Sequence, residues 1–425
     1  MEFTTDEWNV PFGAGGSPWD GKFYVEMAQA LERACFDMIM AADTLMVSEA
    51  YGSSMEAYLK HALLVPQHDP APLASMIAAA TRNIGVAITL STMGYPPFLL
   101  ARLCRTLDHI SAGRFAWNIV TTAENHAAQN FGLTKLPDRQ LRYDMADEYM
   151  DLVCKLFDSW DADAIVRDRD KGIYADHKRV HPINFEGTYF RSRGPLNTAP
   201  SPYGRTVFLQ AGGSPRGRTF AAKYADCIIA ISPGVEAMKA HRDDVLARAA
   251  AAGRNPNDIK MLFCVTPTLG ETEEEALAKH QRMVNSPAFI EQSLAFIAGI
   301  TDIDFAKFDL DKELPYLTTN GEQGSLDMFA QWGSGKKLRQ LVIEASGGLL
   351  ASVELVGTPD QVAERMGEAM EQVGGDGYLI TSPSLKVSRR YIAEITDGLV
   401  PALQRRGLAR KKYTAATLRE TLKEF

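Results

Sequence analysis

The chain has 425 residues, of which 23% are charged, and its formal net charge is −8 at neutral pH. This acidic balance argues against nucleic acid as the main partner, because phosphate contacts require clustered lysine and arginine. No apolar run reaches the roughly 18 residues that a membrane span needs, so we expect no membrane partner. The five cysteines are widely spaced and form no CxxC or Cys/His cluster. We therefore expect no metal site, reduced thiols and a cytoplasmic protein.

From residue 21 onward, short apolar runs alternate with runs of helical spacing, while residues 1–20 are rich in glycine, proline and aromatic residues and predict an irregular arm. The apolar runs predict seven strands, at residues 37–43, 84–91, 114–121, 206–211, 226–231, 261–266 and 376–381. The helical spacing predicts helices at residues 21–34, 70–81, 98–111, 140–160, 216–224 and 359–373. This alternation predicts a parallel sheet with right-handed crossovers, folded as a (β/α)8 TIM barrel.

Three segments interrupt the alternation and predict insertions into a single domain that spans residues 1–425. They cover residues 44–69, 161–201 and 286–350, and the last of them has helical rather than strand patterns. Long loops beside a binding site often act as lids, so we expect the first and third insertions to cover the site.

The barrel prediction leaves the first strand unaccounted for. A closed barrel of this type has eight strands, whereas the pattern gives seven, and the deficit lies at the N-terminus. Residues 1–5 lack the apolar run of a central strand, and the run Gly13–Gly16 argues against a regular strand there. We therefore expect a missing or truncated first strand. Either the natural start lies upstream of Met1, or residues 1–20 fold back to fill the gap.

Polar side chains follow four of the predicted strands at the point where each strand ends. In the central stretch, GRFAWNIVTT, an apolar run leads into an amide and two hydroxyls. The polar strand-end residues are Asp43, Ser91, Thr92, Asn118, Thr122, Gly213 and Ser214. In a barrel these ends converge on one mouth, which is where α/β barrels place their binding site. The alternative is that they are ordinary strand ends and helix caps.

The sequence GGSPRGR at residues 212–218 predicts an anion site. Its glycines allow close backbone approach, Ser214 is suited to cap the following helix, and Pro215 fits the first helical turn. The free N–H groups and the positive end of the helix dipole would then face an anion. Tyr143, beside Arg142 in the first turn of another helix, is a second candidate for phosphate binding. The alternatives are a merely well-capped helix and a half-buried aromatic residue.

Longer motifs carry a family resemblance. They are LARLCRTLDHISAGRFAWNIVTT, NFG at 130–132, RYDMADEY at 142–149, GPLNTAPSPYGRTVFLQAGGSPRGR at 194–218 and VPALQRRG at 400–407. In this order they resemble the bacterial-luciferase-like FMNH2-dependent monooxygenases, in the branch that acts on nitrilotriacetate, EDTA, long-chain alkanes and dibenzothiophene sulfone. The resemblance covers nearly the whole chain from residue 21 and implies a (β/α)8 barrel with insertions.

The resemblance also implies a function. It implies reduced FMN delivered by a separate NAD(P)H:flavin reductase, and O2 as co-substrate, in the oxygenation of a sulfone, alkane, aminopolycarboxylate or heterocycle. It implies a flavin site built from Asp43, Ser91, Thr92, Asn118, Thr122, Tyr143, Gly213 and Ser214. Relatives pair through helices that flank the early strands, here 70–81 and 98–111, so we expect a homodimer or homotetramer.

The catalytic residue stays open. Relatives carry an active-site histidine in an N-terminal stretch that this chain lacks, and Ser48 stands where they have an aromatic residue. The candidates here are Asn118, His126 and Tyr51. Two alternatives also stay open: a deazaflavin-dependent oxidoreductase on the same barrel, and a non-catalytic flavin-binding paralogue, suggested by the missing first strand.

Overall fold

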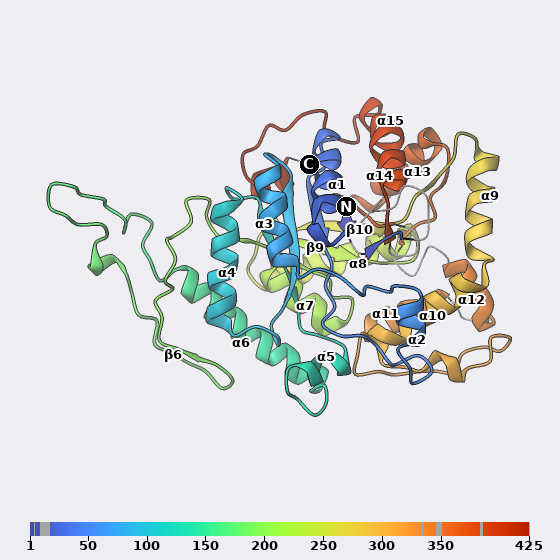
Figure 1. Ribbon diagram of the computed structural model, residues 1–425, viewed down its shortest axis with the longest axis horizontal. Coiled ribbons are helices and arrows are strands. Elements are labelled where there is room, and N and C mark those ends of the chain that lie inside the picture. The colour runs from blue at the N-terminus through green and yellow to red at the C-terminus, as the bar shows by residue number, and fades with distance from the viewer. Residues whose placement is uncertain (4, 9–17, 333–334, 346–350, 383–385, 425) are drawn as a thin grey trace.

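Eight parallel strands form the central sheet of the computed structural model, which describes residues 1–3, 5–8, 18–332, 335–345, 351–382 and 386–424 (Figure 1). In spatial order the strands are β1 (Glu2–Phe3), β3 (Met38–Ala41), β4 (Gly85–Ser91), β5 (Phe115–Val120), β8 (Val207–Gln210), β9 (Cys227–Ala230), β10 (Lys260–Val265) and β13 (Gly377–Ile380). Each neighbouring pair is parallel. The seven predicted strands are all present at closely matching positions, which confirms the predicted α/β barrel class.

Helices follow the strands and surround the sheet (Figure 1). They include α1 (Lys22–Arg33), α3 (Pro70–Ala80), α4 (Pro97–Ile110), α5 (Asn125–Asn130), α6 (Arg139–Phe157), α7 (Pro215–Tyr224), α8 (Gly234–Ala251), α9 (Glu273–Val284), α13 (Pro359–Val373), α14 (Arg389–Ala393) and α15 (Val400–Arg405). Several of them begin with a side-chain cap: the Asp69 carboxylate accepts a hydrogen bond of 2.8 Å from the Ala71 amide, and Thr358 forms a capping box with Gln361. In the described part of the chain, no helix has both the length and the apolar character to cross a bilayer.

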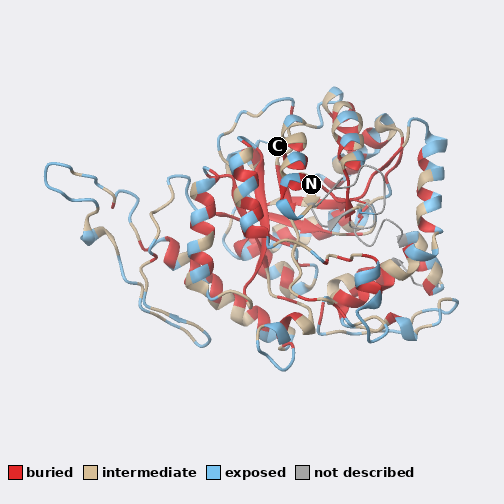
Figure 2. Ribbon diagram, in the orientation of Figure 1, coloured by how far each residue is buried: buried red, intermediate tan, exposed pale blue. Residues whose placement is uncertain are grey.

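The sheet is buried on both faces, which explains why its strands read as continuous apolar runs (Figure 2). All seven residues of β4 are buried. Trp117 on β5 is fully buried, and its Nε1 donates a hydrogen bond of 3.0 Å to the Leu90 carbonyl. Its ring meets the Phe208 ring edge-on, with the centroids 5.6 Å apart. Packing of this kind contributes roughly 0.5–1.5 kcal/mol beyond the burial of the rings themselves.

The first strand is a two-residue stub, as the prediction of a truncated strand requires. Glu2 and Phe3 pair with Met40 and Ala41 of β3. Next along the chain, β2 (Thr5–Asp6) pairs with β14 (Lys386–Val387), beyond β13. The first residues thus enter the position of the missing strand, although they lack an apolar run. Strand pairing uses only their backbone groups, and the Glu2 side chain lines a cavity instead of packing in the core. The Gly13–Gly16 run of the predicted arm lies outside the described residues.

The three long segments between barrel elements differ in character. Residues 44–69 contain the short helix α2 (Glu56–Lys60), and residues 161–201 form an extended excursion with the hairpin β6 (Phe185–Glu186) and β7 (Arg191–Ser192), which projects from the body (Figure 1). The described part of 286–350 holds three main helices: α10 (Pro287–Thr301), α11 (Gln323–Trp332) and α12 (Leu338–Ala345). Tyr58 of α2 and Phe296 of α10 share one apolar cluster, so the first and third segments pack together.

The C-terminal helix closes the end of the barrel where the strands begin. Leu418, the first residue of α16 (Leu418–Lys423), lies among interior side chains that include Met38 and Val207. Gly85 makes room for it, because a Cβ at this position would lie 2.6 Å from the Leu418 side chain. A larger residue at position 85 would therefore displace this helix.

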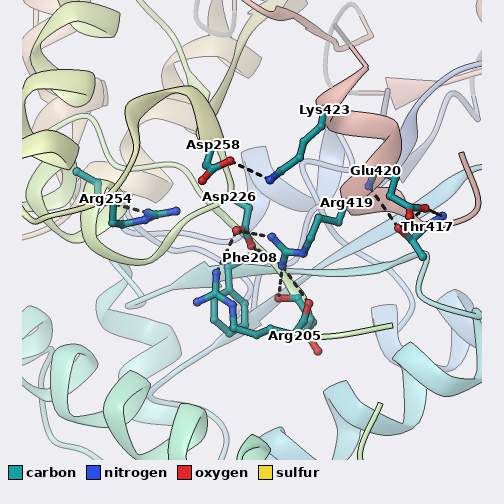
Figure 3. A network of polar contacts seen from close by, with 11 residues as sticks. Arg205, Phe208, Asp226, Arg254, Asp258, Thr417, Arg419, Glu420 and Lys423 are labelled. Carbon is teal, nitrogen blue, oxygen red and sulfur yellow. Dashed lines mark hydrogen bonds and ion pairs between the residues drawn. The ribbon is translucent and has the colours of Figure 1, made fainter. Parts of the chain in front are cut away.

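A polar network ties the same helix to the barrel (Figure 3). At its centre, the Asp226 carboxylate accepts hydrogen bonds from Arg419 Nη1 at 2.7 Å and Arg205 Nη2 at 3.0 Å. It also accepts one from the Phe208 amide at 2.9 Å. Burial opposes ionisation of Asp226, but its hydrogen bond and ion pair with Arg419 outweigh burial and lower its pKa below the ordinary value.

Candidate active site

The C-terminal ends of the strands open into a cavity of about 320 Å³, a volume in the range of small-molecule sites. The predicted flavin-binding residues that line it are Asp43, Ser91, Asn118, Thr122, Tyr143, Gly213 and Ser214. Thr92 does not line it, because its hydroxyl is turned to the Val120 carbonyl, to which it donates at 3.3 Å. The structure thus brings together all of the predicted strand-end residues except Thr92.

Two amides in this cavity lack a partner for one oxygen. Asn118 Nδ2 donates to Thr89 Oγ1 at 2.9 Å, which fixes the side chain, but Asn118 Oδ1 is buried without a partner among the described residues. The Oε1 atom of Gln210, the last residue of β8, is in the same state. An unpaired buried acceptor costs roughly 1–3 kcal/mol, so both atoms suit the N–H groups of a ligand.

Ser91 and Thr122 form the polar link between two neighbouring strand ends. Their hydroxyl oxygens lie 2.5 Å apart, and Ser91 Oγ also accepts a hydrogen bond from the Met93 amide at 3.1 Å. Thr122 has a φ of 55°, in the left-handed region that β-branched residues rarely adopt. Backbone strain of this kind is tolerated where the surroundings enforce it, as they do at binding sites.

The start of α7, with Ser214 and Tyr143, has the geometry expected of an anion site, and we refer to it as the anion cradle. Ser214 Oγ accepts a hydrogen bond of 3.1 Å from the Gly217 amide and so caps the helix. The buried Tyr143 hydroxyl lies next to the Ser214 side chain at this helix end. A Cβ at Gly217 would lie 2.7 Å from the Tyr143 hydroxyl, so Tyr143 can approach the helix end only because residue 217 is glycine. Gly324 of α11, in the third insertion, lies against Gly213. A Cβ at position 324 would lie 3.2 Å from the Gly213 backbone, so the close approach depends on glycine.

Two arginines at the start of α6 hold the third insertion beside this cradle. Arg142 Nη2 donates to the Asn320 carbonyl at 2.8 Å, and the Arg139 amide donates to Asn320 Oδ1 at 2.9 Å. Burial lowers the pKa of Arg142 to about 10, so its guanidinium is still charged at neutral pH. The Nε atoms of both arginines are buried without a partner in the described chain, and both residues line the cavity. The corner beside Ser214 is therefore electropositive.

Carboxylic acids line the rest of the polar wall. Asp43 accepts a hydrogen bond of 2.7 Å from Gln67 Nε2, and burial, followed by the charge of Asp69, raises its pKa to about 7. Burial likewise raises the pKa of Glu322 to about 7 and raises that of Glu124. At neutral pH Asp43 and Glu322 therefore hold protons for part of the time, and such raised pKa values are typical of acids at functional sites.

Apolar side chains from the two packed insertions cover the cavity. They are Leu45, Met46, Tyr58 and Leu64 from the first insertion, and Phe296, Ile300 and Met328 from the third. Gly299 of α10 lets Tyr58 approach, because a Cβ there would lie 2.0 Å from the Tyr58 hydroxyl. An apolar cover of this kind excludes water from the space beneath it.

Two of the three catalytic candidates do not line the cavity. His126 lies on α5, with Nε2 4.0 Å from Glu49 Oε2. Tyr51 packs against the apolar clusters of the insertion helices. Asn118 is therefore the one catalytic candidate of the three that the structure places in the wall.

Several lining residues were not predicted. Gln210 is the one polar residue near the end of the run TVFLQA, so the rule that selects Asn118 also selects it. Glu124, His241 and Glu322 also line the cavity, but they lie on a loop, a helix and an insertion, respectively. Their local patterns are those of surface positions, and only the packing of distant segments brings them to the site.

Comparison with known proteins identifies the family. The model of a protein family described as "Luciferase-like monooxygenase" matches residues 9–377 of this chain. The chain is 36% identical to the dimethyl-sulfide monooxygenase of Hyphomicrobium sulfonivorans, over 98% of this chain and 86% of the relative. It is 34% identical to the dibenzothiophene-sulfone monooxygenase of Rhodococcus erythropolis, over 95% of this chain and 89% of that relative.

A solved structure extends this similarity to three dimensions. The crystal structure of a riboflavin lyase with modified FMN and substrate riboflavin superimposes with a TM-score of 0.87 at 31% identity, covering 100% of this chain and 94% of the other. A family match over most of the chain and identities above 30% along nearly its full length leave one assignment. The chain is a member of the luciferase-like monooxygenase family and is therefore an oxidoreductase.

Proposed function

We propose that this chain is the oxygenating component of a two-component system in the cytoplasm. It binds reduced FMN delivered by a separate NAD(P)H:flavin reductase and uses O2 to oxygenate a small organic substrate. The observation that supports this most strongly is the pairing, within one cavity, of unpartnered amide oxygens at Asn118 and Gln210 with the anion cradle at Ser214. Flavin mononucleotide carries ring N–H groups and a phosphate, so the residues present fit it.

In this proposal Asn118 and Gln210 accept hydrogen bonds from the ring system. Ser214, Tyr143 and the first turn of α7 hold the phosphate, with charge support from Arg142. When bound, the reduced flavin supplies the electrons that activate O2. The chain orients the flavin and the substrate and keeps water out beneath the apolar cover, and Asp43, with its pKa of about 7, can hold or release a proton in the wall.

The lining favours a neutral, mainly apolar substrate. Relatives are named for dimethyl sulfide, dibenzothiophene sulfone and long-chain alkanes, as well as for nitrilotriacetate. A polycarboxylate would meet Asp43, Glu124 and Glu322 in the wall, and these acids repel it whenever they are ionised. We therefore place the substrate among sulfides, sulfones and hydrocarbons.

A turnover assay tests the proposal. The purified chain, a flavin reductase, NADH and FMN are incubated with dimethyl sulfide, dibenzothiophene sulfone, an alkane series and nitrilotriacetate, and products are identified by mass spectrometry with labelled O2. We expect label in a product of one of the first three classes. Flavin binding without any product would favour the non-catalytic paralogue, and anaerobic hydride transfer with a deazaflavin would favour the other alternative.

We also propose a homodimer or a dimer of dimers through α3 and α4. The segment Pro70–Ala80 has no charged residue, and Met76 on it is 42% exposed. On α4, Leu99 is 51% exposed. Exposed apolar surface on adjacent helices is typical of an interface. The double substitution Met76→Lys with Leu99→Lys should yield monomers by light scattering at micromolar concentration, whereas Leu277→Lys on α9 should not, and a monomeric parent protein would contradict the proposal.

A further inference from the structure

We infer that His241 is a further flavin-binding residue, whose imidazole Nε2–H donates a hydrogen bond to the phosphate end of the cofactor. The inference rests on the proposed function, because it assumes that a flavin occupies the cavity. It adds a residue on α8 to an anion cradle otherwise built from α6 and α7. It also predicts that the site distinguishes FMN from riboflavin, which lacks the phosphate.

The position of His241 is fixed on one side only. The residue is 3% exposed and lines the cavity, in company with Gly213 and Ser214. Its Nδ1 lies 2.9 Å from Ser232 Oγ, and Ser232 is itself held by a hydrogen bond of 3.1 Å from its amide to Ser352 Oγ. Nε2, on the opposite side of the ring, is buried and has no partner in the described chain.

A phosphate beside the ring would select one tautomer, because the contact between Ser232 Oγ and Nδ1 is compatible with both. Burial first, and then the charge of Arg218, lowers the pKa of His241 to about 4, so the ring is neutral at neutral pH. A neutral imidazole that accepts from the Ser232 hydroxyl at Nδ1 carries its proton on Nε2 and presents a donor. The other tautomer would present a lone pair, which an anion would repel.

The neighbouring charges place this donor at the phosphate end. Arg218 Nε donates to the Gly213 carbonyl at 2.9 Å, and its Nη1 donates to Asp244 at 3.2 Å. Arg218 and Asp244 are the charged groups that act on His241, and they are paired with each other. Arg218 thus links the surroundings of His241 to the Gly213 carbonyl at the start of α7, and we assign the Nε2–H of His241 to an oxygen of a phosphate held there.

The test compares FMN with riboflavin. Dissociation constants for both flavins, in their reduced form under anaerobic conditions, are measured for the parent protein and for His241→Leu. We expect His241→Leu to weaken FMN binding roughly 10- to 100-fold, the range for losing a hydrogen bond to a charged group, and riboflavin binding less than about threefold. His241→Gln, which keeps an N–H near the same position, should recover part of the FMN affinity.

His280 supplies the matched control. It is a second buried histidine with one unpartnered ring nitrogen among the described residues, but it lies on α9 outside the cavity lining. His280→Leu should leave both affinities unchanged. If His241→Leu does not fold, Ser232→Ala and His241→Gln carry the test, and Ser232→Ala should weaken FMN binding selectively because it releases Nδ1.

The outcomes separate this inference from the proposed function. Equal losses for FMN and riboflavin, or no loss for FMN, would overturn the role of His241 while the flavin site itself stands. If the parent protein binds neither flavin, the proposed function fails, and the inference fails with it.

Discussion

The two ends of the barrel shift the pKa of a buried carboxyl group in opposite directions. Where the strands begin, Asp226 accepts hydrogen bonds from two arginines and an amide, and its pKa lies below the ordinary value (Figure 3). Where the strands end, Asp43 has one hydrogen bond from a neutral amide, and burial raises its pKa to about 7. Nearby, Asn118 Oδ1 and His241 Nε2 have no partner in the described chain.

This difference shows how one sheet separates stability from function. Satisfied ion pairs at the strand starts fix the last helix to the barrel. Unsatisfied groups at the strand ends cost free energy in the empty protein, and a ligand with matching donors and acceptors recovers that cost. The same division is typical of α/β barrels, whose binding sites lie at the C-terminal face.

Removing the centre of the stability end should have the largest effect. Asp226→Ala leaves Arg419 and Arg205 without their shared carboxylate, so we expect the free energy of unfolding to fall by about 3 kcal/mol. Chemical denaturation measures this change. The exposed pair of Asp258 and Lys423 provides the control, since Asp258→Ala should cost less than about 1 kcal/mol. Equal effects of the two substitutions would contradict the assigned importance of Asp226.

At the opposite end, substitutions in the anion cradle should act on binding. Ser214→Leu and Tyr143→Phe should each weaken FMN binding by roughly 1–3 kcal/mol, because they remove hydrogen bonds to a charged phosphate. Fluorescence titration measures the dissociation constants. Thr272→Leu, which removes the cap of α9 and lies outside the cavity lining, should leave FMN binding unchanged. Unaltered affinity in both cradle variants would remove these residues from the site.

Asp43, at the C-terminal ends of the strands, should make the folded protein less stable as pH rises. The pKa of Asp43 is about 7 in the folded protein and roughly 4 in an unfolded chain, so the folded state binds more protons between these values. Stability therefore falls as pH rises from about 4 to 7, and the loss is complete above pH 7. Asp43→Asn should stabilise the protein by about 1–2 kcal/mol at pH 8, with no gain at pH 4. Thermal unfolding at both pH values checks this, and a destabilised variant at pH 8 would contradict it.

Local signals account for much of what the sequence predicted. The strand ends at Asn118 and Thr122 and the cap at Ser214 depend on a few adjacent residues, and the structure shows each in place. Gln210 has the same local pattern as Asn118, a polar residue at the end of a buried apolar run.

Other positions depend on packing between segments far apart in the sequence. Tyr51 was expected near the flavin, but the docking of α2 on α10 places it in an apolar cluster of the insertions. Glu322 reaches the cavity only because Asn320 is held by Arg139 and Arg142 on α6. The stub Glu2–Phe3 carries no apolar pattern, because its pairing uses backbone groups. No local pattern reports contacts of this kind.

The most direct test of the central claim, that the strand-end cavity is the flavin site, is a crystal structure of the protein with FMN bound. We predict the phosphate within hydrogen-bonding distance of Ser214 and Tyr143, and the ring system against Asn118 and Gln210. A flavin bound elsewhere on the protein, with this cavity empty at saturating FMN, would contradict the account.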